Sequence, residues 1–219
     1  MTDVTAPNGE AERDFFRRAR ARLTLDVPAA LNDHTAPGRR GDLDLDPAMW
    51  ERAGVTATRP AAVLIPVVDR PEPTVLLTRR AELPSHPGQI AFPGGKIDPR
   101  DATPADAALR EAEEEIGLPR ALIEPIGYLD LYLTFSGYRI LPTVARVQPG
   151  HALVLCEAEV ADAFEVPLDF LMNAQNHALH SRDWKGVTRR YYAMPFGERY
   201  IWGVTAGILR NLYERIYAD

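Results

Sequence analysis

This chain of 219 residues has only one cysteine, no long apolar run and no surplus of positive charge. Cys156 is the single cysteine, so no internal disulfide forms, which fits a reducing compartment. The longest apolar run, residues 61–68, contains Pro66 and is far too short to span a bilayer. Residues 1–16 lack the apolar segment of a secretory signal, and residues 216–219 carry no peroxisomal address. We therefore expect a cytoplasmic protein that does not enter a membrane.

The charge balance bears on the partners of the protein. Lys and Arg number 25 against 31 Asp and Glu, which gives a net charge of −6 and disfavours a general nucleic-acid surface. With 46% hydrophobic and 26% charged residues the chain is not wholly disordered, and its length allows one sizeable core plus an appendage. An acidic protein that binds an anionic substrate must gather positive charge locally or use a metal ion.

Acidic residues gather in one short tract, REAEEEIG. Glu111, Glu114 and Glu115 stand at i, i+3 and i+4, which places them on one face of a helix. Each close pair of like charges there costs about 0.2–0.5 kcal/mol, so a neutralising cation would favour the cluster. Carboxylate oxygens select Mg²⁺, Mn²⁺ or Ca²⁺ over zinc. We expect a metal site and, through it, phosphate chemistry.

The alternative interpretation of this tract is a solvated acidic helix face, which is the usual explanation of a charge run. The residues just before it argue for a site instead. Residues 92–95 form the glycine-bearing sequence FPGG, and glycine lets a backbone approach a phosphate closely.

Local signals define the helix that carries the acids. Thr103 is a suitable N-cap, and Pro104 suits the first helical position. Gly117 can adopt the left-handed conformation that ends a helix. Arg110 precedes Glu114 by one turn, so the two side chains can pair. The apolar stripe expected to face a core comprises Ala105, Ala108, Leu109, Ala112 and Ile116.

Residues 95–118 resemble the Nudix box, a pattern of fixed glycine, glutamate and arginine positions. The matching positions are Gly95, Arg110, Glu111, Ala112, Glu114, Glu115, Gly117 and Leu118. Two departures exist: Asp101 stands where the pattern has Glu, and eight residues rather than seven separate it from Arg110. The resemblance therefore carries no role over to Asp101. It implies an α/β sandwich with a mixed sheet between helices, and Mg²⁺ or Mn²⁺ as cofactor.

The segment before the glycine turn narrows the family. Residues 76–95 resemble the extended signature of coenzyme A diphosphatases, carried by Leu76, Leu77, Thr78, Arg80, His86, Gly88, Gln89 and the FPGG sequence. Pro84 and Ser85 occupy a stretch where that subfamily usually has an arginine. Residues 159–168 and 201–206 resemble later segments of the same subfamily. The implied reaction splits coenzyme A, or a derivative, into 4'-phosphopantetheine and adenosine 3',5'-bisphosphate.

The resemblance also implies the roles of individual residues. Glu111, Glu114 and Glu115 are the expected metal ligands, although one of them can instead act as the base. Arg110 would orient a carboxylate and Gly95 would shape the loop beside it. The candidates for substrate contacts are Arg79, Arg80 and His86 for the 3'-phosphate, Lys96 for a phosphate, and Glu159 as a further acid. For each of these five, an ordinary surface or structural role is the alternative.

The resemblance covers the later part of the chain, so we expect residues 59–219 to form the Nudix domain and residues 1–58 to be an N-terminal helix and loop extension. The predicted strands are residues 61–68, 74–78, 123–132, 138–147 and 189–194. The predicted helices, besides the acidic one, are residues 12–23, 158–164, 167–173 and 202–217.

Rival functions remain open at this point. One is a Nudix hydrolase acting on another nucleoside diphosphate compound, such as ADP-ribose or NADH. Another is a catalytically silent binding module, although such modules usually lack the box glutamates. An RNA-cap hydrolase is disfavoured because its large anionic substrate favours a basic surface. The partner we expect is a small nucleotide substrate, and a homodimer is left open.

Overall fold

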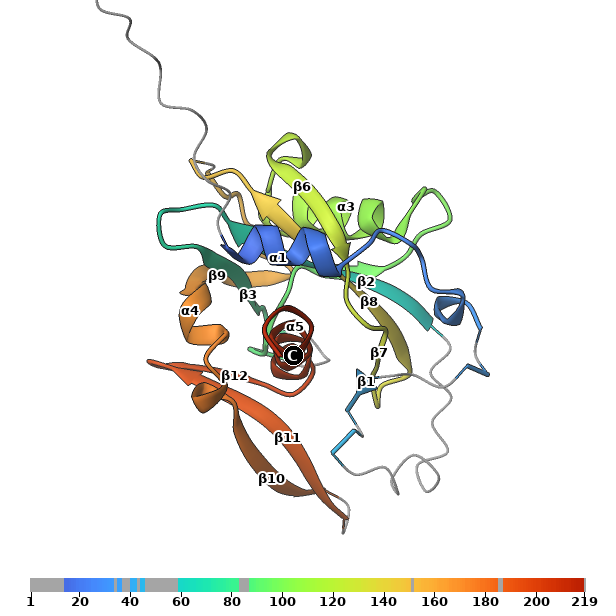
Figure 1. The fold of residues 1–219 in the computed structure, drawn as a ribbon, viewed down its shortest axis with the longest axis vertical. Coiled ribbons are helices and arrows are strands. Elements are labelled where there is room, and N and C mark those ends of the chain that lie inside the picture. The colour runs from blue at the N-terminus through green and yellow to red at the C-terminus, as the bar shows by residue number, and fades with distance from the viewer. Residues whose placement is uncertain are drawn as a thin grey trace, which may run out of the picture.

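A mixed sheet with helices on both faces forms the body of the protein (Figure 1). The computed structural model describes residues 14–33, 35–36, 40–42, 44–45, 59–82, 87–150, 152–184 and 187–218. Within these ranges the larger sheet has nine strands and a second sheet has three. This arrangement confirms the predicted α/β class with a mixed sheet between helices.

Strand β2 (Arg59–Val68) is the centre of the larger sheet. It runs parallel to β8 (Tyr138–Val147) along its whole length, and antiparallel to β3 (Thr74–Arg80) and β5 (Gly94–Lys96). Strand β6 (Ile123–Tyr128) pairs with β8, while β4 (Ile90–Ala91) and β9 (Val160–Pro167) pair with β3. The remaining strands of this sheet are β1 (Arg40–Gly41) and β7 (Tyr132–Leu133), which pair with each other.

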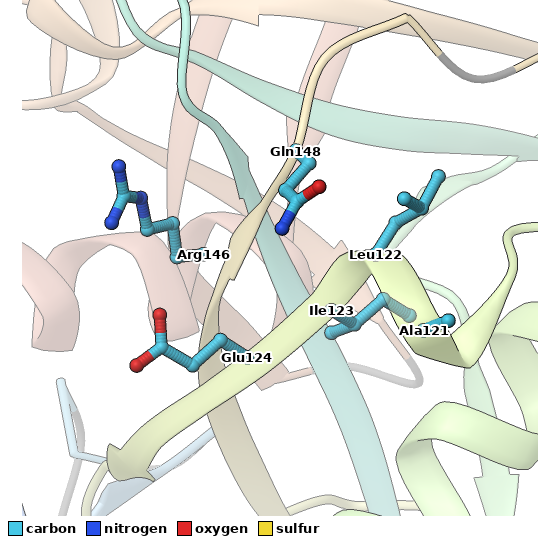
Figure 2. A pocket seen from close by; sticks show the side chains of 6 residues that line it. All are labelled: Ala121, Leu122, Ile123, Glu124, Arg146 and Gln148. Carbon is cyan, nitrogen blue, oxygen red and sulfur yellow. The ribbon is translucent and has the colours of Figure 1, made fainter.

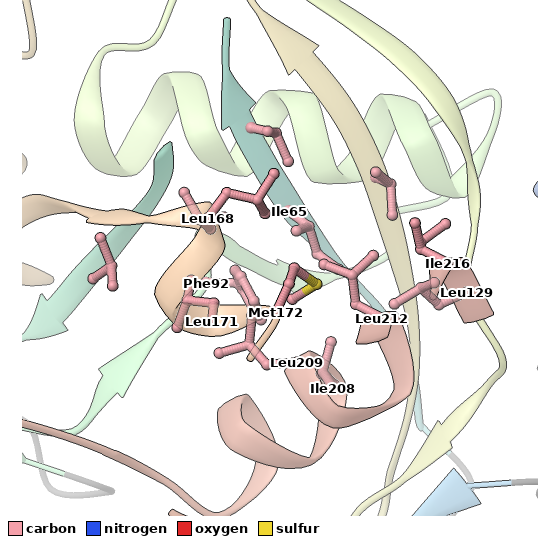
Figure 3. Packing of buried hydrophobic residues seen from close by; sticks show 14 of the residues in the cluster. Ile65, Phe92, Leu129, Leu168, Leu171, Met172, Ile208, Leu209, Leu212 and Ile216 are labelled. Carbon is pink, nitrogen blue, oxygen red and sulfur yellow. The ribbon is translucent and has the colours of Figure 1, made fainter. Parts of the chain in front are cut away.

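Alternation along the central strands supplies a separate core to each face of the sheet. Leu64 and Leu76 pack against α3 (Pro104–Ile116) on one face. Ile65 and Leu77 pack on the other face, against α1 (Asp14–Arg22) and α5 (Val204–Ile216). Figure 3 shows the second core, in which α4 (Leu168–Leu171) and α5 contribute most of the labelled side chains. The helix that carries the acidic tract is thus held from beneath by its apolar stripe.

The smaller sheet consists of β10 (Ala178–Trp184), β11 (Val187–Phe196) and β12 (Arg199–Trp202), joined antiparallel. It extends from the body beside α5 in Figure 1. The sequence predicted part of β11 but missed β10. Residues 178–184 are largely polar, and the strand is held by its pairing with β11.

Two further predictions were wrong in detail. Residues 158–164, expected to be helical, lie mostly in strand β9, because β9 pairs with β3 over seven residue pairs. The single strand expected at residues 123–132 stops at Tyr128 and resumes at Tyr132. The other expected helices and strands are present, most of them with shifted ends, and the N-terminal helix buries Phe15 and Phe16. Within the described ranges, no helix combines the length and apolarity that crossing a membrane requires.

Candidate active site

The acidic helix α3 has the ends that the sequence predicts. The Thr103 hydroxyl accepts a hydrogen bond from the Asp106 backbone N–H at 3.1 Å, and Pro104 follows at the first helical position. Gly117 ends the helix with φ of 65°, a left-handed conformation that suits glycine. These caps fix where the helix starts and stops, and therefore which way its acids point.

The three acids differ in their exposure to solvent. The Glu115 residue is 6% exposed, the Glu111 side chain 17% and the Glu114 side chain 56%. The acidic face therefore runs from the interior at Glu115 to solvent at Glu114. Such a gradient contradicts a uniformly solvated acidic face.

The glycine turn lies directly against these acids. Strand β5 pairs with β2, so that Gly95 is opposite Ala62. The Gly94 N–H donates a hydrogen bond of 3.4 Å to Glu115 Oε2. A Cβ atom at Gly95 would lie 2.6 Å from the Cδ atom of Glu111, closer than real Cβ contacts. Glycine is therefore required at residue 95 for the Glu111 carboxylate to sit where it does.

Arg110 joins the acids to each other and to the turn. Its Nη1 donates to Glu111 Oε1 at 2.9 Å and to Glu114 Oε2 at 3.0 Å, which confirms the predicted Arg110–Glu114 pair. Its Nη2 donates to the backbone oxygen of Lys96 at 3.2 Å. One guanidinium therefore sets the positions of two carboxylates and of the strand that follows the glycine turn.

Asp101 completes this arrangement through a contact that the sequence analysis did not predict. Arg110 donates from Nε to Asp101 Oδ1 and from Nη2 to Asp101 Oδ2, each at 3.0 Å. The extra residue between the two is absorbed in the loop before Thr103, where the Asp98 N–H also donates to Asp101 at 2.8 Å. Asp101 thus has a defined contact, although the resemblance carried no role over to it.

Burial makes the ionised forms of Glu111 and Glu115 unfavourable. Burial raises the pKa of Glu115 to about 8, and the neighbouring charge of Glu111 adds to the effect. Burial also raises the pKa of Glu111, although its hydrogen bond from Arg110 opposes the shift. The Arg110 hydrogen bonds lower the pKa of Asp101, which therefore stays ionised. The two carboxyls with raised pKa values are those a cation would stabilise in the ionised form.

A cavity of about 240 Å³, shown in Figure 2, is not lined by any of these acids. Its lining residues are Ala121, Leu122, Ile123, Glu124, Arg146 and Gln148. Arg146 is already paired with Asp69, and Glu124 with Arg20. None of the residues expected to form the site lines this cavity, so it does not compete with the acidic helix as the candidate site.

The comparison with known families decides the identity. The family model described as the NUDIX domain matches residues 58–186. This chain belongs to the Nudix hydrolase family. The residues that resemble the Nudix box lie within this matched range, on α3 and in the glycine turn before it.

Curated relatives with the Nudix name support this membership. A protein of Yersinia pestis (strain Pestoides F), named "Uncharacterized Nudix hydrolase NudL", is 43% identical over 161 residues, covering 72% of this chain and 80% of that protein. The protein of the same name from Yersinia pseudotuberculosis serotype O:1b (strain IP 31758) gives the same values. A Nudix hydrolase structure from Alicyclobacillus acidocaldarius is 22% identical, with a TM-score of 0.47, covering 71% of this chain and 90% of that one.

The Nudix box residues have the donor chemistry that a hard divalent cation requires. Carboxylate oxygens dominate, the lack of a side chain at Gly95 leaves room for the Glu111 carboxylate itself, and burial disfavours the charges of Glu111 and Glu115. Among the described residues, however, no group of three His, Cys, Asp or Glu side chains converges within metal-binding reach. Arg110 draws Glu111 and Glu114 together while Glu115 turns towards Gly94. The assignment of three metal ligands accordingly stays a prediction.

The candidate substrate residues are spread around the Nudix box. Arg80 lies close enough to Glu115 to lower its pKa by charge, although burial dominates and raises it. Its Nε atom is buried without a hydrogen-bond partner among the described residues. Arg79 is exposed, and its cross-strand partner Asp162 forms an ion pair with Arg199 of β12 at 2.6 Å. The two neighbouring arginines are therefore placed against different groups.

The remaining candidates have different outcomes. Glu159 is exposed, and its charge contributes to the raised pKa values of Glu111 and Glu115, after burial. Glu159 therefore lies near Glu111 and Glu115. The Lys96 side chain is exposed, while its backbone oxygen binds Arg110. His86 lies outside the described residues.

The sequence analysis did not single out Thr205, which supports the site. Thr205 is buried and donates through Oγ1 to the backbone oxygen of Ile90 at 2.9 Å. Ile90 belongs to β4, which leads into the glycine turn. The segment 201–206 that resembles the subfamily thus ties the start of α5 to the strand before the Nudix box. The threonine in this segment is the sequence signal from which that contact could have been predicted.

Proposed function

We propose that this Nudix hydrolase cleaves the diphosphate of coenzyme A, or of a derivative, into 4'-phosphopantetheine and adenosine 3',5'-bisphosphate. The observation that carries the hydrolase part is the assembly of Glu111, Glu114 and Asp101 around one guanidinium, beneath a glycine turn. The substrate part is supported by residues 76–95, whose signature resembles that of the coenzyme A diphosphatases. Nudix hydrolases as a family act on nucleoside diphosphate derivatives, to which coenzyme A belongs.

In this proposal Glu111, Glu114 and Glu115 hold Mg²⁺ or Mn²⁺. The cation would neutralise charge on the diphosphate oxygens and favour ionisation of the attacking water. Arg110 keeps the Glu111 and Glu114 carboxylates oriented, and Asp101 keeps Arg110 in place. Gly95 lets the turn approach Glu111, so that a substrate phosphate meets the backbone of the turn and the acids together.

Arg80 is the strongest candidate for a substrate phosphate contact. Its Nε donor is buried without a partner among the described residues, and an unpaired buried donor is costly. A substrate phosphate would satisfy it with a charge-assisted hydrogen bond. We assign Glu159 a supporting role as a further acid, because its charge acts on both Glu111 and Glu115.

A substrate panel tests the proposal directly. Purified protein is incubated with coenzyme A, ADP-ribose or NADH in the presence of Mg²⁺ or Mn²⁺, and the products are resolved by mass. We expect coenzyme A to give the highest kcat/KM, with 4'-phosphopantetheine and adenosine 3',5'-bisphosphate as its products. Faster turnover of ADP-ribose or NADH would overturn the substrate assignment while leaving the hydrolase assignment intact.

A matched pair of variants on α3 separates the enzyme from a silent binding module. Glu114→Gln removes one proposed ligand, and the Nudix assignment expects it to abolish most turnover. Glu113→Gln makes the same chemical change at the adjacent residue, whose carboxylate pairs with Arg120 at 3.1 Å. It should retain activity. Undiminished turnover in Glu114→Gln would show that this carboxylate takes no part in the reaction.

A further inference from the structure

The smaller sheet carries a row of rings on one face. Strand register pairs His180 with Tyr191, and Trp202 lies two residues further along the same face. Together with Tyr200 these residues form four ring contacts, with centroids 5.4 to 6.4 Å apart. His180 Nδ1 and the Tyr200 hydroxyl are 2.7 Å apart and hydrogen-bonded, which fixes the rings relative to each other. The result is a continuous aromatic surface, of which Tyr200 is 39% exposed.

Two arginines extend this aromatic surface. Arg182 and Arg189 are direct cross-strand partners, and the two-residue alternation of a strand places them on the same face as His180 and Tyr191. Like charges directly opposite each other in a sheet repel. We call the four rings and these two arginines the aromatic–arginine face.

One end of the aromatic–arginine face adjoins the strand that leads into the glycine turn. Trp202 is followed by Gly203, and a Cβ atom there would lie 3.7 Å from the side-chain nitrogen of Gln89. The backbone oxygen of Gln89 accepts a hydrogen bond of 3.0 Å from the Arg80 N–H. This end of the face therefore lies near Gln89, which precedes the Nudix box, and near Arg80, the proposed phosphate contact.

The other end of the aromatic–arginine face reaches the turn just before β8 of the larger sheet. The Arg189 guanidinium lies 4.2 Å from the centre of the Phe135 ring, in the turn before β8. The first residues of β8 pair with the first residues of β2, and Ala61 of β2 pairs with Lys96 of β5. Two independent contacts thus place the aromatic–arginine face near the start of β2, where the glycine turn lies.

We propose that the aromatic–arginine face binds the nucleotide end of the substrate, with the purine ring stacked on the aromatic residues and the 3'-phosphate held by Arg182 and Arg189. This inference rests on the proposed function, because it names where one part of that substrate docks. Aromatic side chains provide stacking surfaces for bases, and guanidinium groups bind phosphate oxygens in a fixed geometry. Both features occur together on one face beside the candidate site.

Coenzyme A and its analogue lacking the 3'-phosphate separate the two halves of this site. Arg182→Gln should raise KM for coenzyme A about tenfold and leave KM for the dephosphorylated analogue nearly unchanged, since charged hydrogen bonds are lost only with the former. Arg190 is exposed on the opposite face of the same sheet, so Arg190→Gln is the matched control and should change neither KM. Equal KM changes for both substrates in Arg182→Gln would overturn the phosphate assignment.

A ring variant tests the stacking half, with binding measured apart from turnover. Tyr191→Ala should weaken binding of adenosine 3',5'-bisphosphate about tenfold in calorimetric titration, because one stacked ring is removed. Circular dichroism and thermal unfolding check that the variant is folded, and Tyr191→Phe should keep most of the affinity. Unchanged affinity in folded Tyr191→Ala would overturn the inference. So would a change of oligomeric state in light scattering with unchanged affinity, which would assign the face to a second copy of this chain.

The two proposals fail in different ways. If the unaltered protein does not hydrolyse coenzyme A, the proposed function fails, and the calorimetric titration still decides whether the face binds the nucleotide. If the protein hydrolyses coenzyme A while Arg182→Gln and Tyr191→Ala leave KM and affinity unchanged, the inference alone fails.

Discussion

Asp101 and Arg110 form a two-pronged ion pair across the loop that precedes α3, with both nitrogen–oxygen distances at 3.0 Å. The Asp101 side chain is 4% exposed and that of Arg110 12%. Because the same guanidinium also binds Glu111 and Glu114, the position of Asp101 is transmitted to two carboxylates of the Nudix box. Asp101 thereby influences two of the proposed metal ligands through Arg110.

Replacing Asp101 with Asn should disturb activity more than folding. The substitution keeps the size of the side chain but removes the charge that holds Arg110, so Glu111 and Glu114 lose their common anchor. Partners that orient metal ligands typically contribute about 10–100-fold to activity, and we expect kcat to fall within that range. The lost charge-assisted bonds should lower the free energy of unfolding by about 1.5–3 kcal/mol. Steady-state kinetics and denaturant unfolding measure the two effects.

The control for Asp101→Asn is Glu113→Gln. Glu113 lies on the same helix, with its side chain 52% exposed and paired to Arg120, so the substitution should change stability by less than about 1 kcal/mol. An Asp101→Asn variant with the kcat of the unaltered protein would show that Arg110 is held well enough by its remaining partners.

The acidic helix could be predicted almost completely from the sequence, because its signals are local. The cap at Thr103, the left-handed end at Gly117 and the apolar stripe all act within a few residues of where they stand. The adjoining turn was also readable, since the glycines of FPGG mark a close backbone approach. These predictions needed no knowledge of how distant segments pack.

The features that could not be predicted from the sequence depend on contacts between distant segments. The Asp101–Arg110 pair depends on the path of a loop with one extra residue, and spacing alone does not give that path. Strand β9 and strand β10 are held by their partners, so local propensity gave a helix for one and nothing for the other. The pairing of β3 with β9 shifts register between Arg79 and Arg80, so the groups that each arginine meets likewise depend on how distant segments pack.

The raised pKa of Glu115 predicts a pH dependence of stability in the absence of metal. Burial raises this pKa from 4.5 to about 8, so the folded protein holds the proton more tightly than the unfolded chain. The unfavourable contribution of Glu115 is therefore absent below pH 4.5, grows as the pH rises towards 8, and is complete above that. Glu115→Gln should abolish turnover yet gain stability relative to the unaltered protein through this window, by at most about 1.4 kcal/mol per pH unit.

Thermal unfolding from pH 5 to 9 in a chelator, and then with Mg²⁺, measures this effect. Metal should raise the Tm of the unaltered protein most at high pH, and should raise that of Glu115→Gln less. Glu113→Gln again serves as the control, because its carboxylate lies in an exposed pair. Parallel Tm curves for the unaltered protein and Glu115→Gln across the whole range would contradict the assigned shift.

Adding a methyl group at residue 95 should displace Glu111. A Cβ there would lie 2.6 to 2.7 Å from the carboxylate atoms of Glu111, so Gly95→Ala forces that side chain away from Arg110. We expect a large loss of kcat and a loss of stability of about 1–3 kcal/mol, typical of overpacking. A double-mutant cycle with Glu111→Ala isolates the clash: the double variant should be more stable than the sum of the single effects predicts. Additive effects would mean that the turn, not Glu111, absorbs the methyl group.

Arg80 and Arg79 should respond differently to the same substitution. Arg80 acts on Glu115 by charge and has a buried Nε without a partner among the described residues. Arg79 is exposed beside Asp162, whose carboxylate is already paired with Arg199. Arg80→Gln should therefore raise KM for coenzyme A by about tenfold or more, in line with the loss of a charged hydrogen bond, whereas Arg79→Gln should raise it far less. The two KM values, measured on variants shown by thermal unfolding to be folded, decide between the arginines. A larger effect at Arg79 would place the substrate phosphate on the side of the sheet that faces β12.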